Sequence, residues 1–386
     1  MKTKKQISLF AGILLLHYLF LTLIQNNLYP IHFDPKKLFF SDLIGKSLYV
    51  PQWLFYILEA GNLILLWIIS KKIFNKYSLI TPFVYSVSPW SSYLVIAGSF
   101  YIYLLFFILV GFYGLLLLKY KNFLGALLIS VAILGVGYSS LTLLLLIPAV
   151  LLITVFKIIS FKDLKIFFVI ITFLLFPLFF LIQTHSVAFR NILDNETKIF
   201  SDPGLLNMVN NYQGAAQQEG LGKLAKISEN KYLFTVENIL LKYTKQLVPS
   251  NYFTPQEKLL NFSFTPPILF GFLIPFVYGL YHLIKLPQRK VLFLSSLLVI
   301  PSVLSRNMVD LNRLIIFAPV VIIVISYGLI ELIKNKKKKI HNIFLILTLI
   351  LIILQSLVVI SDIQLREKAR FTKYYEFEQN YEVGKQ

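Results

Sequence analysis

Residues 343–360 read IFLILTLILIILQSLVVI, a run of eighteen residues without a charged side chain. A helix that crosses a lipid bilayer needs about 20 mostly apolar residues, which is close to the length of this run. Its apolar residues are continuous and do not alternate with polar ones, as they would in the strands of a membrane barrel. Because lipid offers the backbone no hydrogen-bond partner, the run predicts a transmembrane helix.

The composition of the whole chain agrees with that prediction. Of its 386 residues, 57% are hydrophobic and 14% are charged, whereas about a quarter of the residues of a soluble protein are charged. A globular core of this size would not bury so much apolar surface, so a bilayer is the expected solvent for most of the chain. There are no cysteines, which excludes disulfides, thiol catalysis and cysteine-bound metals.

Apolar runs of comparable length recur along the chain. The sequence therefore predicts an all-α polytopic membrane protein with about eleven transmembrane helices. They are expected near residues 7–24, 52–70, 78–91, 101–118, 122–136, 139–156, 166–183, 265–284, 290–305, 313–333 and 341–360. One span more or fewer in residues 78–100, or in residues 122–156 with their closely spaced pair of spans, would invert the topology of everything that follows.

Basic residues set the expected orientation. With the N-terminus in the cytoplasm, the inner segments hold 19 basic residues and two acidic ones, whereas the outer side holds 18 basic and 15 acidic residues. The inner basic residues are Lys2, Lys4, Lys5, Lys71, Lys72, Lys76, Lys119, Lys121, Lys157, Lys162, Lys165, Lys285, Arg289, Lys290, Lys334 and Lys336 to Lys339. An excess of lysine and arginine marks cytoplasmic loops. The formal net charge of +19 is therefore a topology signal, and no nucleic-acid partner is expected.

These assignments divide a multi-pass plasma-membrane protein into four parts. They are an N-terminal transmembrane module over 1–183 with a short first external loop at 25–51, a large external loop over 184–264, C-terminal transmembrane helices over 265–360, and an outer tail over 361–386. The first span follows a basic start, as in a signal peptide. No small-residue cleavage site follows it, so we expect it to be retained.

The large loop is expected to contain short helices. Apolar residues recur at helical spacing over 205–213 and 232–247, and the second stretch has one apolar stripe, made of Leu233, Val236, Ile239, Leu240, Tyr243 and Leu247. Asp202 followed by Pro203 is typical of a helix start. Such helices could lie on the membrane surface or cap the bundle.

No motif of a soluble enzyme is present, so candidate site residues are polar side chains near the membrane boundary. Asp34 and Asp42 are the only carboxylates between the first two predicted spans. A carboxylate there can act as a general base that accepts a proton from a hydroxyl. The alternative is a turn for Asp34, since Asp before Pro is common in turns, and a solvated or capping residue for Asp42.

Glu59 lies in the middle of the predicted span 52–70. Because a carboxylate inside a membrane is costly, it is by default a candidate functional residue. The alternative is a protonated or hydrogen-bonded glutamate that faces another helix.

Three arginines are candidates for binding a phosphate, because the guanidinium group can bind it in a bidentate way. Arg306 and Arg313 flank Asp310 in a short outer loop, and Arg190 begins the large loop. The alternatives are an exposed ion pair between Asp310 and Arg313, and an interfacial position for Arg190. His32 and His185 are isolated, and no metal is expected.

Several stretches carry a family resemblance. They are Ser88-Pro89-Trp90-Ser91-Ser92-Tyr93, Tyr138-Ser139-Ser140 with the later Pro148, residues 199–205 with Glu229-Asn230-Lys231, and Asn312-Arg313-Leu314 with the later Pro319 and Gly328. In this layout the chain resembles the GT-C superfamily of membrane glycosyltransferases, in particular the protein O-mannosyltransferase and aminoarabinose-transferase branch. The resemblance covers most of the chain through short, degenerate motifs.

The resemblance implies transfer of a sugar from a polyprenyl-phosphate donor to an acceptor on the outer side, without a cofactor. It also implies an essential acid in the first external loop, for which Asp34 is the closest match by position and Asp42 the second. Two features depart from the family pattern. The first loop is short and lacks the usual Asp-Glu pair, and Tyr93-Leu94-Val95 stands where an arginine often follows the Pro-Trp element.

Three other classes stay open. A catalytically degenerate scaffold would account for the short first loop. A lipid transporter or flippase would show paired repeats and interrupted helices, which the sequence does not suggest. A polysaccharide polymerase or ligase would concentrate arginines in the large loop, but residues 184–264 contain one arginine, Arg190, and seven lysines.

Overall fold

In the computed structural model, eleven ranges of the chain are described: 2–27, 52–96, 101–117, 122–139, 183–184, 203–220, 230–254, 266–285, 295–303, 317–335 and 339–361. Every element in these ranges is a helix, so the all-α prediction is confirmed there. The elements are α1 (Lys2–Asn27), α3 (Gln52–Phe74), η1 (Asn75–Tyr77), α4 (Ile80–Ser86), α5 (Pro89–Ile96), α6 (Tyr101–Leu117), α7 (Asn122–Ser139), α11 (Pro203–Gln218), α13 (Lys231–Leu247), α14 (Ser250–Phe253), η3 (Phe270–Phe272), α15 (Leu273–Lys285), η4 (Leu297–Val299), α17 (Ile300–Val303), α19 (Ala318–Lys334) and α20 (Lys339–Ser361).

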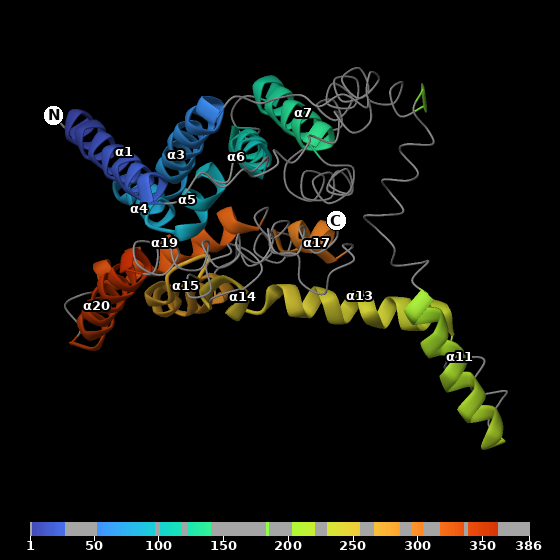
Figure 1. The fold of residues 1–386 in the computed structure, drawn as a ribbon. Coiled ribbons are helices and arrows are strands. Elements are labelled where there is room, and N and C mark those ends of the chain that lie inside the picture. The colour runs from blue at the N-terminus through green and yellow to red at the C-terminus, as the bar shows by residue number, and fades with distance from the viewer. Residues whose placement is uncertain are drawn as a thin grey trace, which may run out of the picture.

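The helices form two groups (Figure 1). Helices α1 and α3 to α7 lie together, and α15, α19 and α20 form a second group that packs against the first where α19 contacts α4. Helices α13 and α11 lead away from these groups as an arm, with α11 set at an angle to α13. Buried apolar side chains from both groups belong to one continuous core.

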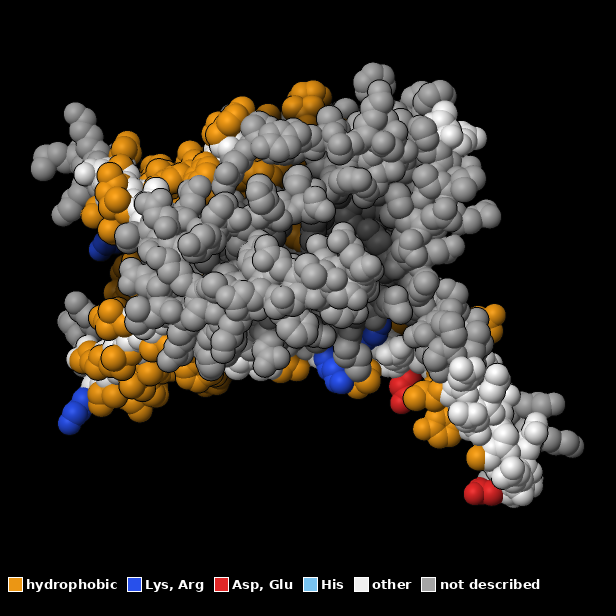
Figure 2. Space-filling view, viewed as in Figure 1, with side chains coloured by type: hydrophobic (Ala, Val, Ile, Leu, Met, Phe, Trp, Pro, Cys, Tyr) orange, Lys and Arg blue, Asp and Glu red, His pale blue; other side chains and the backbone are white. Residues whose placement is uncertain are grey.

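Two helical segments in the described ranges are long and apolar enough to cross a bilayer, namely Trp53–Tyr77 and Lys339–Ser361. Only 17% of the most apolar part of α20 is buried, and large apolar side chains cover its outer side (Figure 2). A contiguous exposed apolar surface of this kind is typical of a partner or membrane interface. Shorter apolar helices occupy Gln6–Leu19, Tyr101–Leu117, Phe123–Val136 and Phe270–Lys285. The count of eleven spans stays a prediction.

Several predicted boundaries differ in the structure. Helix α1 extends through Asn27, so residues 25–27 belong to a helix and not to the first loop. Helix α7 runs to Ser139 through the junction expected at residues 137 and 138. Helix α19 begins at Ala318, five residues after the predicted start of that span. The expected spans 139–156 and 166–183 lie almost wholly outside the described residues.

The predicted span at 78–91 is not a single helix, because the chain breaks between α4 and α5. Pro89 has no backbone N–H and is placed at the first position of a new helix, where none is needed. The carbonyl of Tyr85 instead accepts the Ser88 N–H at 3.0 Å and the Ser91 hydroxyl at 3.1 Å. The Ser88 hydroxyl donates back to the Val84 carbonyl at 2.7 Å. These bonds satisfy the backbone at the break, as apolar surroundings require.

Helices α15 and α19 cross at two glycines. A Cβ atom on Gly279 would collide with the Val324 carbonyl oxygen, and one on Gly328 would collide with the Pro275 carbonyl oxygen. Small residues let helix backbones approach closely, which is a common way of packing helices in membranes. Because Gly279 and Gly328 have no side chains, the backbones of α15 and α19 can come into direct contact, which allows the close packing of the second helix group.

The basic ends of several helices are brought together at one end of the bundle. The Lys71 ammonium lies 5.9 Å from the Trp67 ring, and that ring stacks on Phe10 near the start of α1. The Lys334 ammonium lies 5.9 Å from the ring of Tyr77, just after α3. The starts of α3 and α19 consequently lie at the opposite end.

The helices predicted in the large loop are confirmed, with longer bounds. Helix α11 starts at Pro203, and α13 starts after Asn230, whose side chain accepts the Tyr232 N–H at 2.9 Å as an N-cap. The predicted apolar stripe of α13 is divided between two environments. Ile239, Tyr243 and Leu247 pack against the core, whereas Leu233, Val236 and Leu240 are exposed.

Helix α20 allows a direct test of membrane insertion. Ile350 is near its middle and about half exposed, so Ile350→Lys is expected to impair insertion by about 2.5–3.5 kcal/mol. Ile340→Lys, at the end of the same helix, is the matched control, since a lysine there can reach the polar boundary. The fraction of α20 that inserts, measured with α20 as the test segment of a membrane-insertion reporter, shows the effect, and equal insertion of both variants would contradict a spanning α20.

Candidate functional site

Most of the predicted site residues lie outside the part of the chain that the structure describes. Asp34, Asp42, Arg190, Arg306 and Arg313 lie outside the described residues, so their predicted roles are untested. His32, His185 and Asp310 lie outside them as well. Glu59 is the one candidate that the structure describes, and it lies at the centre of a buried polar cluster.

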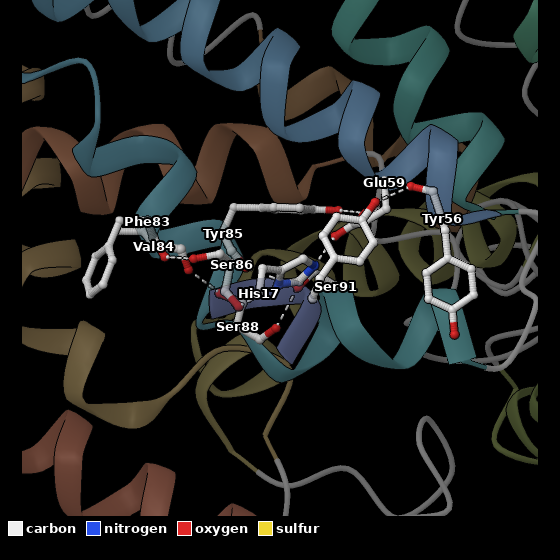
Figure 3. Close-up of polar contacts among 10 residues, drawn as sticks. His17, Tyr56, Glu59, Phe83, Val84, Tyr85, Ser86, Ser88 and Ser91 are labelled. Carbon is white, nitrogen blue, oxygen red and sulfur yellow. Dashed lines mark hydrogen bonds and ion pairs between the residues drawn. The ribbon is translucent and has the colours of Figure 1, made fainter. Parts of the chain in front are cut away.

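Glu59 is fully buried, and both of its carboxylate oxygens have partners. Oε1 lies 2.9 Å from Nε2 of His17, and Oε2 accepts the Tyr85 hydroxyl at 2.7 Å (Figure 3). His17 comes from α1, Glu59 from α3 and Tyr85 from α4, so three helices contribute. The structure therefore shows Glu59 as a hydrogen-bonded glutamate that faces other helices.

The second nitrogen of the His17 ring identifies its tautomer. Nδ1 lies 3.0 Å from the Ser86 carbonyl oxygen, and a carbonyl can only accept. Nδ1 therefore carries a hydrogen and donates it. The Ser86 carbonyl is available because Trp90, its donor in an unbroken helix, donates its N–H to the Pro267 carbonyl at 3.1 Å. The helix break thus creates the acceptor that orients His17.

The hydrogen bonds of His17, Glu59 and Tyr85 determine how many protons these three side chains share. With Nδ1–H donated to Ser86 and the Tyr85 hydroxyl donated to Glu59, one further proton must lie between His17 Nε2 and Glu59 Oε1. If it is on the imidazole the two groups form an ion pair, and if it is on the carboxyl both are neutral. The pair has no net charge in either case. This is the condition under which a buried ionisable pair is tolerated.

Other polar side chains lie close to this pair in the chain. Asn62, three residues after Glu59 on α3, is fully buried. The Tyr18 hydroxyl, next to His17, donates to the Tyr56 carbonyl. In the described part of the chain, no group of three His, Cys, Asp or Glu residues is arranged to hold a metal ion.

A second set of contacts joins the helix break to the second helix group. The Trp90 ring lies 6.5 Å from the Tyr252 ring, which lies 6.3 Å from the ring of Phe317 at the start of α19. The Ile268 N–H donates to the Tyr252 carbonyl at 2.8 Å. Tyr252 is buried, and burial raises the pKa of its hydroxyl, which therefore stays neutral.

The helices that flank two segments outside the described residues are linked through α5, which packs against both α1 and α3. The end of α1 and the start of α3 flank residues 28–51, which contain Asp34 and Asp42. The start of α19 follows residues 304–316, which contain Arg306 and Arg313. Hydrogen bonds run from Glu59 through His17 to Ser86, before the break. Ring contacts run from Trp90, after the break, through Tyr252 to Phe317, and so connect the two sets of flanking helices.

No protein-family model, no curated protein and no solved structure matches this chain. The resemblance to the glycosyltransferase superfamily therefore depends on the sequence stretches quoted above. Of those, the structure describes residues 88–93, 138–139, 203–205, 230–231, Pro319 and Gly328. Ser88 lies at the break and Pro89 begins α5.

His17 and Tyr85 were missed by the sequence interpretation. A signal for His17 exists, because it and Glu59 are both ionisable and both lie inside predicted neighbouring spans, where such residues usually pair. Tyr85 had no comparable signal among 22 tyrosines.

Proposed function

We propose that this protein is a multi-pass membrane glycosyltransferase that moves a sugar from a polyprenyl-phosphate donor to an acceptor on the non-cytoplasmic face. The observation that carries the proposal is the series of contacts that links α1 and α3, through α5, to the start of α19. Through Trp90, Tyr252 and Phe317, the helices on either side of Asp34 are joined to the helix that follows Arg313. A catalytic acid and a phosphate-binding arginine would share the end of the bundle where these residues lie.

The charge distribution supports the direction of this proposal. Lys71, Lys72 and Lys334 lie at the opposite end of the helices from Trp90 and Phe317. If that basic end faces the cytoplasm, the end with the proposed site faces outward. About eleven spans with a cytoplasmic N-terminus in the plasma membrane complete the proposed topology.

The proposed chemistry is a direct displacement. Asp34 accepts the proton of an acceptor hydroxyl, whose oxygen attacks the anomeric carbon of the donor sugar. The bond from that carbon to the phosphate oxygen breaks, and the polyprenyl phosphate leaves with the bonding electrons. Arg313, with Arg306 or Arg190, binds the phosphate and stabilises its negative charge. The proposed partners of the protein are the lipid bilayer and the polyprenyl-phosphate donor. No step of the proposed reaction requires a cofactor.

Asp34→Asn tests the proposal. The amide cannot accept the proton, so transfer by the purified protein from a polyprenyl-phosphate sugar is expected to fall by about 10²–10⁴-fold, with unchanged thermal stability. Asp42→Asn is the matched control, because it removes the other carboxylate of the same segment and is expected to keep most of the activity. Undiminished turnover in Asp34→Asn would exclude Asp34 as the base.

A transporter is the second candidate. The sequence did not suggest interrupted helices, but the predicted span at 78–91 is broken between α4 and α5. Interrupted helices line the substrate sites of many transporters. Uptake of a lipid or solute by proteoliposomes, unaffected by Asp34→Asn, would favour that class over the enzyme.

A further inference from the structure

We propose that His17 and Glu59 are a hydrogen-bonded positioning pair that holds the break between α4 and α5, and through it the contact between the two helix groups. The inference rests on the proposed function only in its final step, the effect on sugar transfer. Its structural step involves none of the residues proposed for the chemistry.

The pair substitutes for a missing helix bond. In a continuous helix the Ser86 carbonyl would accept the N–H of Trp90, four residues later. That N–H is directed to the Pro267 carbonyl, on the far side of the break, at 3.1 Å. The His17 ring supplies the replacement donor to Ser86 at 3.0 Å. While the Trp90 N–H is donated to Pro267, the Ser86 carbonyl therefore has a donor only when His17 is in place.

Glu59 determines whether His17 is in place. The side chains of both residues are fully buried, so neither can turn to water for a partner. Glu59 bonds to Nε2 of His17 at 2.9 Å and is itself held by the Tyr85 hydroxyl at 2.7 Å, one residue before Ser86. The ring is thus fixed at both nitrogens, directly to Ser86 of α4 and, through Glu59 of α3, to the neighbouring Tyr85. Removal of Glu59 leaves a buried imidazole nitrogen without its partner, which is strongly unfavourable.

The break transmits this position to the second helix group. Beyond Pro89, Trp90 makes the backbone bond to Pro267 and the ring contact with Tyr252. Tyr252 in turn contacts Phe317, at the start of α19. A loosened break would therefore release the start of α19, which follows the segment with Arg306 and Arg313.

Hydrogen–deuterium exchange of the full-length protein in detergent tests the structural step. Glu59→Leu is expected to increase the opening of the backbone amides at 84–96 by on the order of 100-fold. Glu59→Gln is expected to stay within about threefold of the wild type, because its amide can donate to His17 while its oxygen accepts from Tyr85. Ser70→Ala is the matched control. It removes a buried bond of 2.8 Å to Thr81 between the same two helices, away from the break.

The double variant His17→Leu with Glu59→Leu covers the case in which Glu59→Leu does not fold. It removes both members of the pair, so no buried imidazole or carboxylate is left unpaired, and only the neutral Tyr85 hydroxyl loses its acceptor. The double variant is therefore expected to fold, yet Ser86 stays without a donor and exchange at 84–96 stays raised. Wild-type exchange in that double variant would overturn the proposal. Exchange in Glu59→Gln as fast as in Glu59→Leu would overturn it too, since the hydrogen bonds would then not be what holds the break.

A sugar-transfer assay tests the last step of the inference, the effect of the pair on activity. In Glu59→Leu, kcat is expected to fall while Glu59→Gln restores it, because the two variants differ in positioning and not in any reacting group. If the wild type transfers no sugar but the exchange pattern is as expected, the proposed function fails and the positioning pair stands. If the Glu59→Leu protein has a loosened break but transfers sugar at the wild-type rate, the proposed link between the positioning pair and sugar transfer is overturned.

Discussion

Gly328→Ala is expected to destabilise the protein by about 3 kcal/mol or more, and to prevent accumulation of folded protein if no backbone shift relieves the strain. The added methyl group would lie on the Pro275 carbonyl oxygen. Since the obstacle is the backbone of a neighbouring helix, no side-chain rotation removes it. The two helices must separate, with the loss of packing along α15 and α19. Thermal unfolding in detergent, followed by light scattering, measures the loss.

Gly12→Ala is the control for this prediction. Gly12 is also a helical glycine in an apolar segment, but a Cβ atom there meets nothing within 4 Å. Replacement of an unhindered helical glycine by alanine is neutral or stabilising, by up to about 1 kcal/mol. Equal stability of the two variants would contradict the close crossing of α15 and α19.

Trp90→Ala is expected to cost about 3–5 kcal/mol of stability, the range for removing a large buried aromatic side chain. Trp90 is 5% exposed and contacts Tyr252, so its loss leaves a cavity where the two helix groups meet. The backbone bond from Trp90 to Pro267 is kept in this variant, so the change reports on the side chain. Thermal unfolding again provides the measurement.

Trp53→Ala is the matched control, because Trp53 is 60% exposed at the start of α3. Its replacement is expected to change stability by less than about 1 kcal/mol. A double-mutant cycle of Trp90→Ala with Tyr252→Ala should show a coupling of roughly 0.5–3 kcal/mol, as for residues in contact. Strict additivity would mean that the two rings do not carry the contact between the groups.

The helices themselves were largely predictable. Long apolar runs predicted α3 and α20, and the Asp202-Pro203 pair predicted the first residue of α11. These features are local, since hydropathy and the missing N–H of proline act within one or two helical turns. The break at Pro89 was not predicted from the same rule, because an apolar run with one proline is compatible with a kinked continuous helix.

The candidate site was predictable only in part. Glu59 was recognisable as an ionisable residue in an apolar run, but its partners lie 42 positions earlier and 26 positions later in the chain. No local pattern specifies which of many tyrosines or carbonyls will face it. The roles of Asp34, Asp42 and the three arginines stay predictions that the proposed experiments address.

The amino-acid sequence was sufficient for the helical class of the described residues and for the apolar character of most of their helices, because both follow from the local pattern of each segment. The pairing of His17 with Glu59, the new acceptor at Ser86 and the close crossing at Gly279 and Gly328 depended on the folded chain. Each requires atoms from distant segments to meet, and in a low-dielectric interior a polar group is stable only where its partner has been brought to it.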